Sequence, residues 1–351
     1  FLLTVQASDR SGVAGEREVS LLLTATAGGD GTGFMLGECC DAAAILKGDY
    51  GQSARDGGFI RHSGFDEHPP GWADAGVCSD TMYDKPGMVI ADSSGGNFNP
   101  DDPADALLEG DPWLVVDPSI TDGTFDNFGP YTWDEVRDRA TIILDGSTQC
   151  AYMADGSLTV CGLSSSSLKL EGDELYPRYN GDGTCDTGHP LNWGSDDPDD
   201  ACFNHFPVIL SKGEVELRNN NGIRVYGQGV IILDYDSVAG TGAEFEWETD
   251  VFFNGVTLGK GCIEIQKGTL YRGAIFLDAE YDGMTCDKSN NFYVDCKAAD
   301  GCVETRIQWS QCVVDRALTQ SNLFDMVTPT ITNEGGVTTR LGTRAFSELL
   351  R

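Results

Sequence analysis

Two six-residue stretches, GVIILD at 229–234 and GAIFLD at 273–278, are near copies of each other, and a related stretch, FNGVTL at 253–258, lies between them. All three fall within residues 203–278, where short apolar and β-branched runs alternate with glycine, a pattern that indicates β-strands. Equivalent strands that recur about every 20 residues are typical of a β-solenoid, in which each coil buries its inward side chains against its neighbours. Because the spacing is uneven, a β-sandwich with three similar hairpins stays open as the alternative.

The composition describes a folded and strongly acidic protein. Its 351 residues are 40% hydrophobic, which is enough for substantial cores. The 23 basic and 56 acidic residues give a net charge of −33, so a nucleic-acid backbone would be repelled and we exclude nucleic acid as a partner. The acidic excess suits divalent cations, a cationic surface or solubility in salt-rich water.

Twelve cysteines are spread along the chain without a repeated C-x-x-C pair, which argues against zinc ribbons and iron–sulfur clusters. Disulfides formed in an oxidising compartment explain them better. The pairs predicted from short bracketed loops are Cys150 with Cys161, Cys185 with Cys202, and Cys286 with Cys296. We therefore expect an extracellular or cell-surface protein, with a targeting segment or membrane anchor upstream of the apolar start FLLTV.

The sequence predicts a mixed α+β chain that is mainly β, in three regions. Residues 1–28 carry helix formers at helical spacing and end at a glycine cluster, which predicts an amphipathic helix. Residues 29–200 are rich in Gly and Asp and predict a disulfide-braced β region, with a short helix over 133–140 capped by Thr132 and a hairpin over 150–161. Residues 201–351 predict the solenoid, with a helix from Val313 and a final capping helix over 343–350.

One loop has the composition of a calcium site. Asn180, Asp182, Thr184 and Asp186 place oxygen atoms at alternate positions with glycines between them. The loop departs from an EF-hand because Cys185 stands where glycine is expected, so a plain Asx-rich turn is the alternative. A cluster of aspartates at 196–200 follows closely enough to share an ion, and a second oxygen-rich run lies at 97–105.

The sequence offers no catalytic constellation. The four histidines, at 62, 68, 189 and 205, form no i, i+4 pair on a convincing helix, and no G-x-S-x-G or dinucleotide fingerprint occurs. Carboxylate pairs carry little information in so acidic a chain, although Asp234 and Asp278 end equivalent strands and could line an exposed face. We therefore predict no catalytic residues and no enzymatic reaction.

Several of these stretches resemble one protein family. CFNHFPVI at 202–209, GQGVIILD at 227–234, FFNGV at 252–256 and IQWSQCVVDRAL at 307–318 are similar to the C-terminal region of PilX-like minor pilins. The resemblance implies that residues 1–28 are the lower half of a pilin stem helix. It also implies that Leu2, Leu3 and Val5 pack against other copies of the chain or against pilin subunits in a filament.

The function predicted from the sequence is that of a secreted structural protein that acts in assembly or adhesion at the cell surface. The alternative is a carbohydrate-active or carbohydrate-binding β-solenoid with a surface polysaccharide as its partner. A binding groove would then need convergent acids and a cation, for which Arg218, Arg224 and Arg272 are the candidates.

Overall fold

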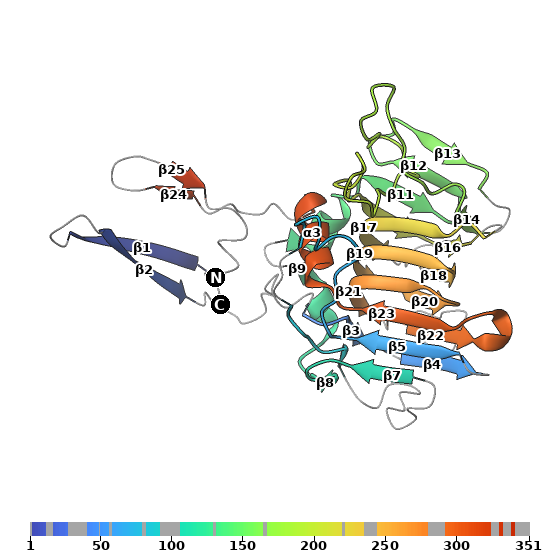
Figure 1. The fold of residues 1–351 in the computed structure, drawn as a ribbon, viewed down its shortest axis with the longest axis horizontal. Coiled ribbons are helices and arrows are strands. Elements are labelled where there is room, and N and C mark those ends of the chain that lie inside the picture. The colour runs from blue at the N-terminus through green and yellow to red at the C-terminus, as the bar shows by residue number, and fades with distance from the viewer. Residues whose placement is uncertain are drawn as a thin grey trace.

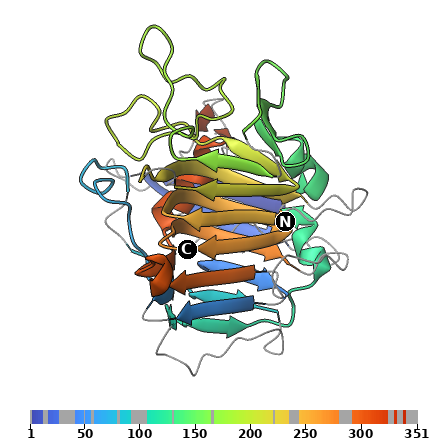
Figure 2. The same ribbon diagram turned by 90° about the vertical axis from the view of Figure 1, so that its right-hand side faces the viewer.

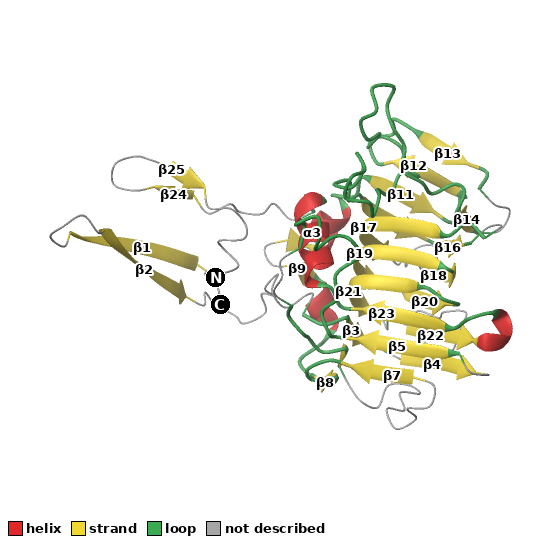
Figure 3. Cartoon of the chain, in the orientation of Figure 1, coloured by secondary structure: helices red, strands yellow, loops and turns green. Residues whose placement is uncertain are grey.

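A computed structural model gives the fold (Figure 1). The structure describes residues 2–11, 17–26, 41–48, 50–55, 58–78, 82–91, 106–128, 131–163, 167–219, 222–234, 244–279, 292–323, 330–332 and 338–340. These residues are mainly in strands, as the sequence predicts, with a few short helices (Figure 3). No helix among them is long and apolar enough to cross a membrane.

Two mainly parallel sheets form the body of the molecule, and over its central part the chain alternates between them. In the central part of the larger sheet the order is β11 (Ile142–Asp145), β15 (Val208–Lys212), β17 (Val225–Asp234), β19 (Val251–Lys260) and β21 (Leu270–Asp278). The smaller sheet has the order β14 (Leu168–Glu171), β16 (Glu214–Arg218), β18 (Glu244–Thr249), β20 (Cys262–Gln266), β22 (Phe292–Lys297) and β4 (Tyr50–Arg55). From β14 to β22, consecutive strands belong to the smaller and the larger sheet in turn, and the strands of each sheet lie side by side (Figures 1 and 2).

The stack continues with strands from the N-terminal part of the chain. The first half of β21 pairs with β23 (Glu304–Gln308), and its second half pairs with β3 (Ala44–Lys47). Beyond them lie β5 (Phe59–Ser63), β6 (Met88–Ile90), β7 (Ala106–Glu109) and β8 (Leu114–Val116). The order of layers thus differs from the order of the sequence, and strands from the predicted regions 29–200 and 201–351 share both sheets.

Inward-facing apolar side chains fill the space between the two sheets. Val215, Phe245, Ile263 and Phe292 follow one another in register along the smaller sheet and are at most 1% exposed. Trp247 on this sheet lies edge-on to Tyr271 on the larger one, with 5.8 Å between ring centroids. Burial on this scale explains why stacking rather than local propensity holds the strands in place.

A ladder of three glycines crosses the long strands. Gly229, Gly255 and Gly273 are direct neighbours on β17, β19 and β21. Gly229 and Gly273 have φ angles of 135° and 131°, which side chains disfavour. A Cβ on Gly273 would lie 1.8 Å from the Gly255 carbonyl oxygen, so only glycine allows the strands to pass this closely.

Short helices and loops cover the outer side of the long strands. α2 (Trp133–Arg137) begins at the Thr132 N-cap, as predicted, but ends earlier than residue 140. Next to it are η1 (Asp122–Phe125), β9 (Asn127–Phe128) and β10 (Tyr131–Thr132), and Phe125 packs on Phe276 with 4.4 Å between centroids. α3 (Gln311–Gln320) packs on β17, β19 and β21 and includes the predicted helix from Val313. β12 (Cys150–Met153) and β13 (Thr159–Cys161) form the predicted hairpin.

The helix predicted over residues 1–28 is wrong. The structure has two antiparallel strands there, β1 (Leu2–Ser11) and β2 (Arg17–Thr26). Threonine and valine recur in both segments and favour extended backbone, while glycines at 12 and 15 interrupt the helical run. Leu2, Leu3 and Val5 lie on β1, and their role in assembly stays a prediction. The chain also has β24 (Thr330–Thr332) paired with β25 (Thr338–Arg340), and the predicted cap over 343–350 lies outside the described residues.

The described residues include four complete disulfides. Cys150–Cys161 and Cys185–Cys202 form as predicted. The predicted Cys286–Cys296 pair is wrong, because η3 (Ala298–Asp300) and the left-handed Gly301 turn the chain back and join Cys296 to Cys302. Cys78–Cys312 links residues 234 positions apart, and Cys262 is also disulfide-bonded.

Candidate functional site

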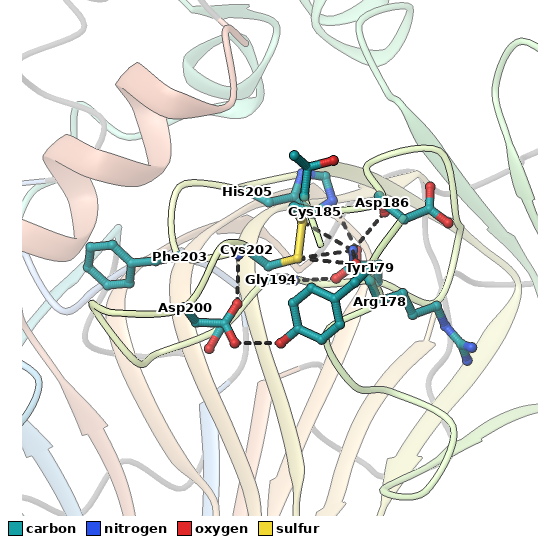
Figure 4. The surroundings of a disulfide bond; sticks show 12 residues. Arg178, Tyr179, Cys185, Asp186, Gly194, Asp200, Cys202, Phe203 and His205 are labelled. Atoms are coloured by element: carbon teal, nitrogen blue, oxygen red, sulfur yellow. Dashed lines mark hydrogen bonds between the residues drawn. A yellow bond between two sulfur atoms is a disulfide. The ribbon is translucent and has the colours of Figure 1, made fainter. Parts of the chain in front are cut away.

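The candidate site is a long loop at one end of the stack, residues 176–206, which we call the disulfide loop. It contains no helix or extended strand, and the Cys185–Cys202 disulfide closes its centre (Figure 4). Two turns of the loop meet around Asn192, which is fully buried. The Asn192 side-chain amide donates to the carbonyl oxygens of Asp186 at 2.7 Å and Arg178 at 3.3 Å, and its Oδ1 accepts from the Gly194 N–H at 3.2 Å. The polar groups of a buried loop backbone need hydrogen-bond partners, and the Asn192 side chain is the partner of three such groups.

The disulfide loop is also fixed to the stack beneath it. Gln228 on β17 donates from its side chain to the carbonyl oxygens of Phe203 at 2.9 Å and His205 at 3.0 Å, and it is fully buried. Its backbone N–H donates to the Trp193 carbonyl at 2.9 Å. The loop therefore has a defined shape even though it has almost no regular secondary structure.

Aromatic and charged side chains lie on the exposed side of this loop. Tyr176 and Tyr179 are 48% and 50% exposed. The Arg178 guanidinium lies 4.1 Å from the Tyr176 ring centroid and donates to its hydroxyl at 2.8 Å. The Tyr179 hydroxyl donates to Asp200 at 2.5 Å, and this hydrogen bond is the main cause that raises the pKa of Tyr179 to about 12 (Figure 4). Such preordered aromatic surfaces are suited to binding a partner.

The residues predicted to bind calcium lie in this loop and are engaged in its turns. Asp182 Oδ1 accepts from the Thr184 N–H at 3.0 Å and hydroxyl at 2.7 Å, and these bonds lower the pKa of Asp182. Asn180 donates its side-chain amide to Thr184 Oγ1 at 3.0 Å, and Asp186 accepts from the Gly188 N–H at 3.1 Å. Asp200, in the later aspartate cluster, caps the Cys202 N–H at 2.6 Å. The structure thus brings Asn180, Asp182 and Thr184 together and directs Asp186 to the next turn; calcium binding stays a prediction. The run at 97–105 lies outside the described residues.

A second cluster was not predicted: a row of glutamates on the smaller sheet. Glu216, Glu246 and Glu264 are direct neighbours on β16, β18 and β20. Carboxylate oxygens of Glu244, Glu246 and Glu264 lie within 4.8 Å of one another, a set of hard ligands that could hold a divalent cation. The E-x-E alternation in EVELR and EFEWET is the sequence signal that could have located it.

Crowding of these carboxylates changes their acidity. Burial, assisted by repulsion from Glu264, Glu244 and Glu216, raises the pKa of Glu246 from 4.5 to about 8. Lys169 forms an ion pair with Glu216, and Arg218 lies 3.6 Å from the same carboxylate. The row is therefore only partly neutralised by its basic neighbours.

Replacing Glu246 with glutamine is expected to stabilise the protein at pH 8 to 9. Between pH 4.5 and 8 the Glu246 carboxyl keeps its proton in the folded state but has lost it in the unfolded state. Its contribution to the free energy of unfolding is therefore complete below pH 4.5 and is lost as the pH rises through 8. Because the side chain is only half-buried, we expect a gain on the order of 1–2 kcal/mol at pH 8.5 and little change at pH 5. Urea unfolding at both pH values measures this, with Asp74→Asn, an exposed carboxylate elsewhere, as control; equal effects of the two variants would contradict it.

Asp234 and Asp278 do not line an exposed face, contrary to the prediction. They are 7% and 0% exposed and alternate with lysines on neighbouring strands, in the order Asp234, Lys260, Asp278, Lys47. Residues of α2 and η1, which cover these strands, add partners of opposite charge. Arg137 lies 3.3 Å from Asp234, and Asp122 lies 2.7 Å from Lys47. This alternating ladder stabilises the stacking register.

The predicted cations do not gather at one site. Arg218 on β16 pairs with Glu171, Arg224 stacks on Phe252 with 4.9 Å to the ring centroid, and Arg272 on β21 lies 3.6 Å from Glu67. Of the histidines, His62 is 2% exposed, burial lowers its pKa to about 3, and its Nε2 lies 2.7 Å from the Tyr50 hydroxyl.

An Asn192→Ala variant is expected to loosen the disulfide loop. It removes three hydrogen bonds to the loop backbone and leaves two carbonyl oxygens without this donor, at a cost of about 2–4 kcal/mol. Amide hydrogen exchange by mass spectrometry should show faster exchange over 176–206. Asp199→Ala, an exposed change in the same loop, is the control, and unchanged protection in the Asn192 variant would show that the disulfide alone orders the loop.

Comparisons with protein-family models, with curated proteins and with solved structures found no match to this chain. Its function is therefore argued from its own residues.

Proposed function

We propose that this chain is a secreted structural protein of the cell surface, in which the two-sheet stack is a β-solenoid and acts in assembly or adhesion. One observation carries the proposal: distant parts of the chain, which both contribute strands to the stack, are tied together by the Cys78–Cys312 disulfide across 234 residues. Such a brace suits a rigid module outside the cell, where thiols are oxidised. Its partners in this proposal are other copies of the chain or pilin-like subunits.

The pilin-like part of this proposal now depends on the C-terminal resemblance alone. The residues that resemble the terminal strand and helix of PilX-like proteins form β23 and α3. The stem helix has no place in the proposal, because β1 and β2 occupy its residues. Assembly would instead use the outer surfaces of the stack.

Electron microscopy of the purified chain, with calcium or with a chelator, tests assembly. Filaments or regular arrays in which this chain repeats would support the proposal, and their loss with the chelator would add an ion to the contacts. Single particles under every condition and at every protein concentration would contradict assembly as the function.

A second candidate function, carbohydrate binding, is favoured by the disulfide loop. Tyr176 and Tyr179 are half-exposed, and Arg178 stacks on the first of them, so a flat aromatic and polar surface is already ordered. Affinity electrophoresis in gels that contain acidic or neutral polysaccharides tests this. A Tyr176→Ala variant should lose any retardation, whereas Leu158→Ala, an exposed apolar change on another loop, should keep it.

A further inference from the structure

A histidine lies beside the long-range disulfide. One ring nitrogen of His68 and the sulfur atoms of Cys78 and Cys312 all lie within 4.8 Å of one another. Both cysteines are 8% exposed, so the group is shielded but remains reachable from solvent. We propose that, once the Cys78–Cys312 disulfide is reduced, the two thiolates and His68 form a zinc site.

The positions of these residues suit tetrahedral zinc. Zinc binds thiolate sulfur at about 2.3 Å and imidazole nitrogen at about 2.0 Å, which places neighbouring ligand atoms roughly 3.5–3.8 Å apart. The Cα atoms of Cys78 and Cys312 are 5.4 Å apart, so side-chain rotation alone can separate the two sulfurs to this distance once their bond is broken. Two soft sulfur ligands and one imidazole select zinc over the hard cations calcium and magnesium.

The fourth ligand of the zinc is a water molecule. The nearby Asp66 carboxylate is held away from this role in the proposal, since its two oxygens bind the N–H groups of Tyr83 and Gln311, both at 3.0 Å, and leaving these groups unpaired would have a cost. Three protein ligands and one water is a coordination found in open zinc sites.

The exchange of disulfide for zinc balances in two steps. A thiol reductant supplies two electrons and two protons, which converts the disulfide into two thiols, and the reductant itself becomes a disulfide. Binding of Zn²⁺ then displaces the two thiol protons, while His68 binds as neutral imidazole. In both states the same residues tie α3 to the segment 64–78, so zinc preserves this tie under reducing conditions.

The test compares the wild-type chain with His68→Gln, a variant that keeps every cysteine. Both proteins are reduced with a phosphine under argon, and zinc affinity is measured by competition with a chromophoric chelator. We expect the wild type to bind one zinc ion at least about tenfold more tightly than His68→Gln. Cobalt in place of zinc should give a thiolate-to-metal absorption band that is altered in the variant.

The other thiols released by reduction are present in both proteins, so they do not account for a difference. Cys78→Ser with Cys312→Ser serves as a second variant, which keeps the remaining thiols and should lack the tight site. If the reduced chain unfolds without metal, zinc should restore the near-ultraviolet circular dichroism of the wild type but not of His68→Gln. Equal zinc affinity and equal spectra for wild type and His68→Gln would overturn the proposal.

Discussion

A chain in which Cys78 and Cys312 are both serine is expected to lose about 3–5 kcal/mol of unfolding free energy under oxidising conditions. The disulfide closes a loop of 234 residues, and the entropy that it removes from the unfolded chain grows with loop length. Shorter disulfides inside the same loop reduce the effective length, which is why the expected loss stays within this range. The variant also removes the covalent tie between α3 and the segment 64–78 and leaves only weaker contacts, such as the hydrogen bond from the Gln311 N–H to Asp66, so the two should separate before the sheets unfold.

Cys150→Ser with Cys161→Ser is the matched control, because it removes a disulfide with a sequence separation of only 11. The chain-entropy argument gives it about 2–3 kcal/mol. Urea unfolding without reductant, followed by circular dichroism, measures both variants. A smaller loss for the Cys78 and Cys312 variant than for the control would mean that loop length does not govern these disulfides.

The repeated strands could be predicted because their signal is local. GVIILD and GAIFLD each combine a leading glycine, a buried apolar run and a terminal aspartate, and they fall on β17 and β21. The short disulfides Cys150–Cys161 and Cys185–Cys202 were predictable for the same reason, since the loop that each closes can be seen in the sequence. Thr132 and Glu135 likewise form the capping box that starts α2.

Contacts between distant segments could not be predicted. Nothing in residues 44–63 indicates that they continue the stack beside β21, β22 and β23, because any strand edge offers the same hydrogen-bonding groups. The Cys78–Cys312 pairing depends on that arrangement and was missed with it. The prediction for the first 28 residues failed for a different reason. The spacing of their apolar residues suits a helix as well as a strand, and their β-branched residues favour the strand.

The candidate site was predicted only in part. The loop from Asn180 to Asp186 was singled out by composition, but the buried position of Asn192, which organises the loop, has no local signature. The glutamate row was missed because the E-x-E alternation marks β16 and β18 separately, and the parallel register of β16, β18 and β20 is needed to bring Glu216, Glu246 and Glu264 together.

A Gly273→Ala variant is expected to prevent the stack from forming, at a cost of more than about 4 kcal/mol. Its Cβ would lie 1.8 Å from the carbonyl oxygen of Gly255, and that oxygen belongs to a strand held by pairing on both sides. The φ angle of 131° adds a backbone penalty of its own. The steric conflict and the backbone penalty can be measured separately, because the chain has one glycine at which only the first arises and another at which only the second arises.

Gly301 has a φ of 84°, and a Cβ at this position would have no described atom within 4 Å, so Gly301→Ala carries only the backbone penalty, about 1 kcal/mol. At Gly255 a Cβ would meet the Gly229 oxygen at 2.0 Å without a positive φ, so Gly255→Ala carries only the steric conflict. The yield of folded protein from an oxidising expression host and the melting temperature of what folds should rank Gly301→Ala well above Gly255→Ala and Gly273→Ala. If Gly273→Ala melts within a few degrees of Gly301→Ala, the strands have room to shift apart, and the glycine ladder does not set their spacing.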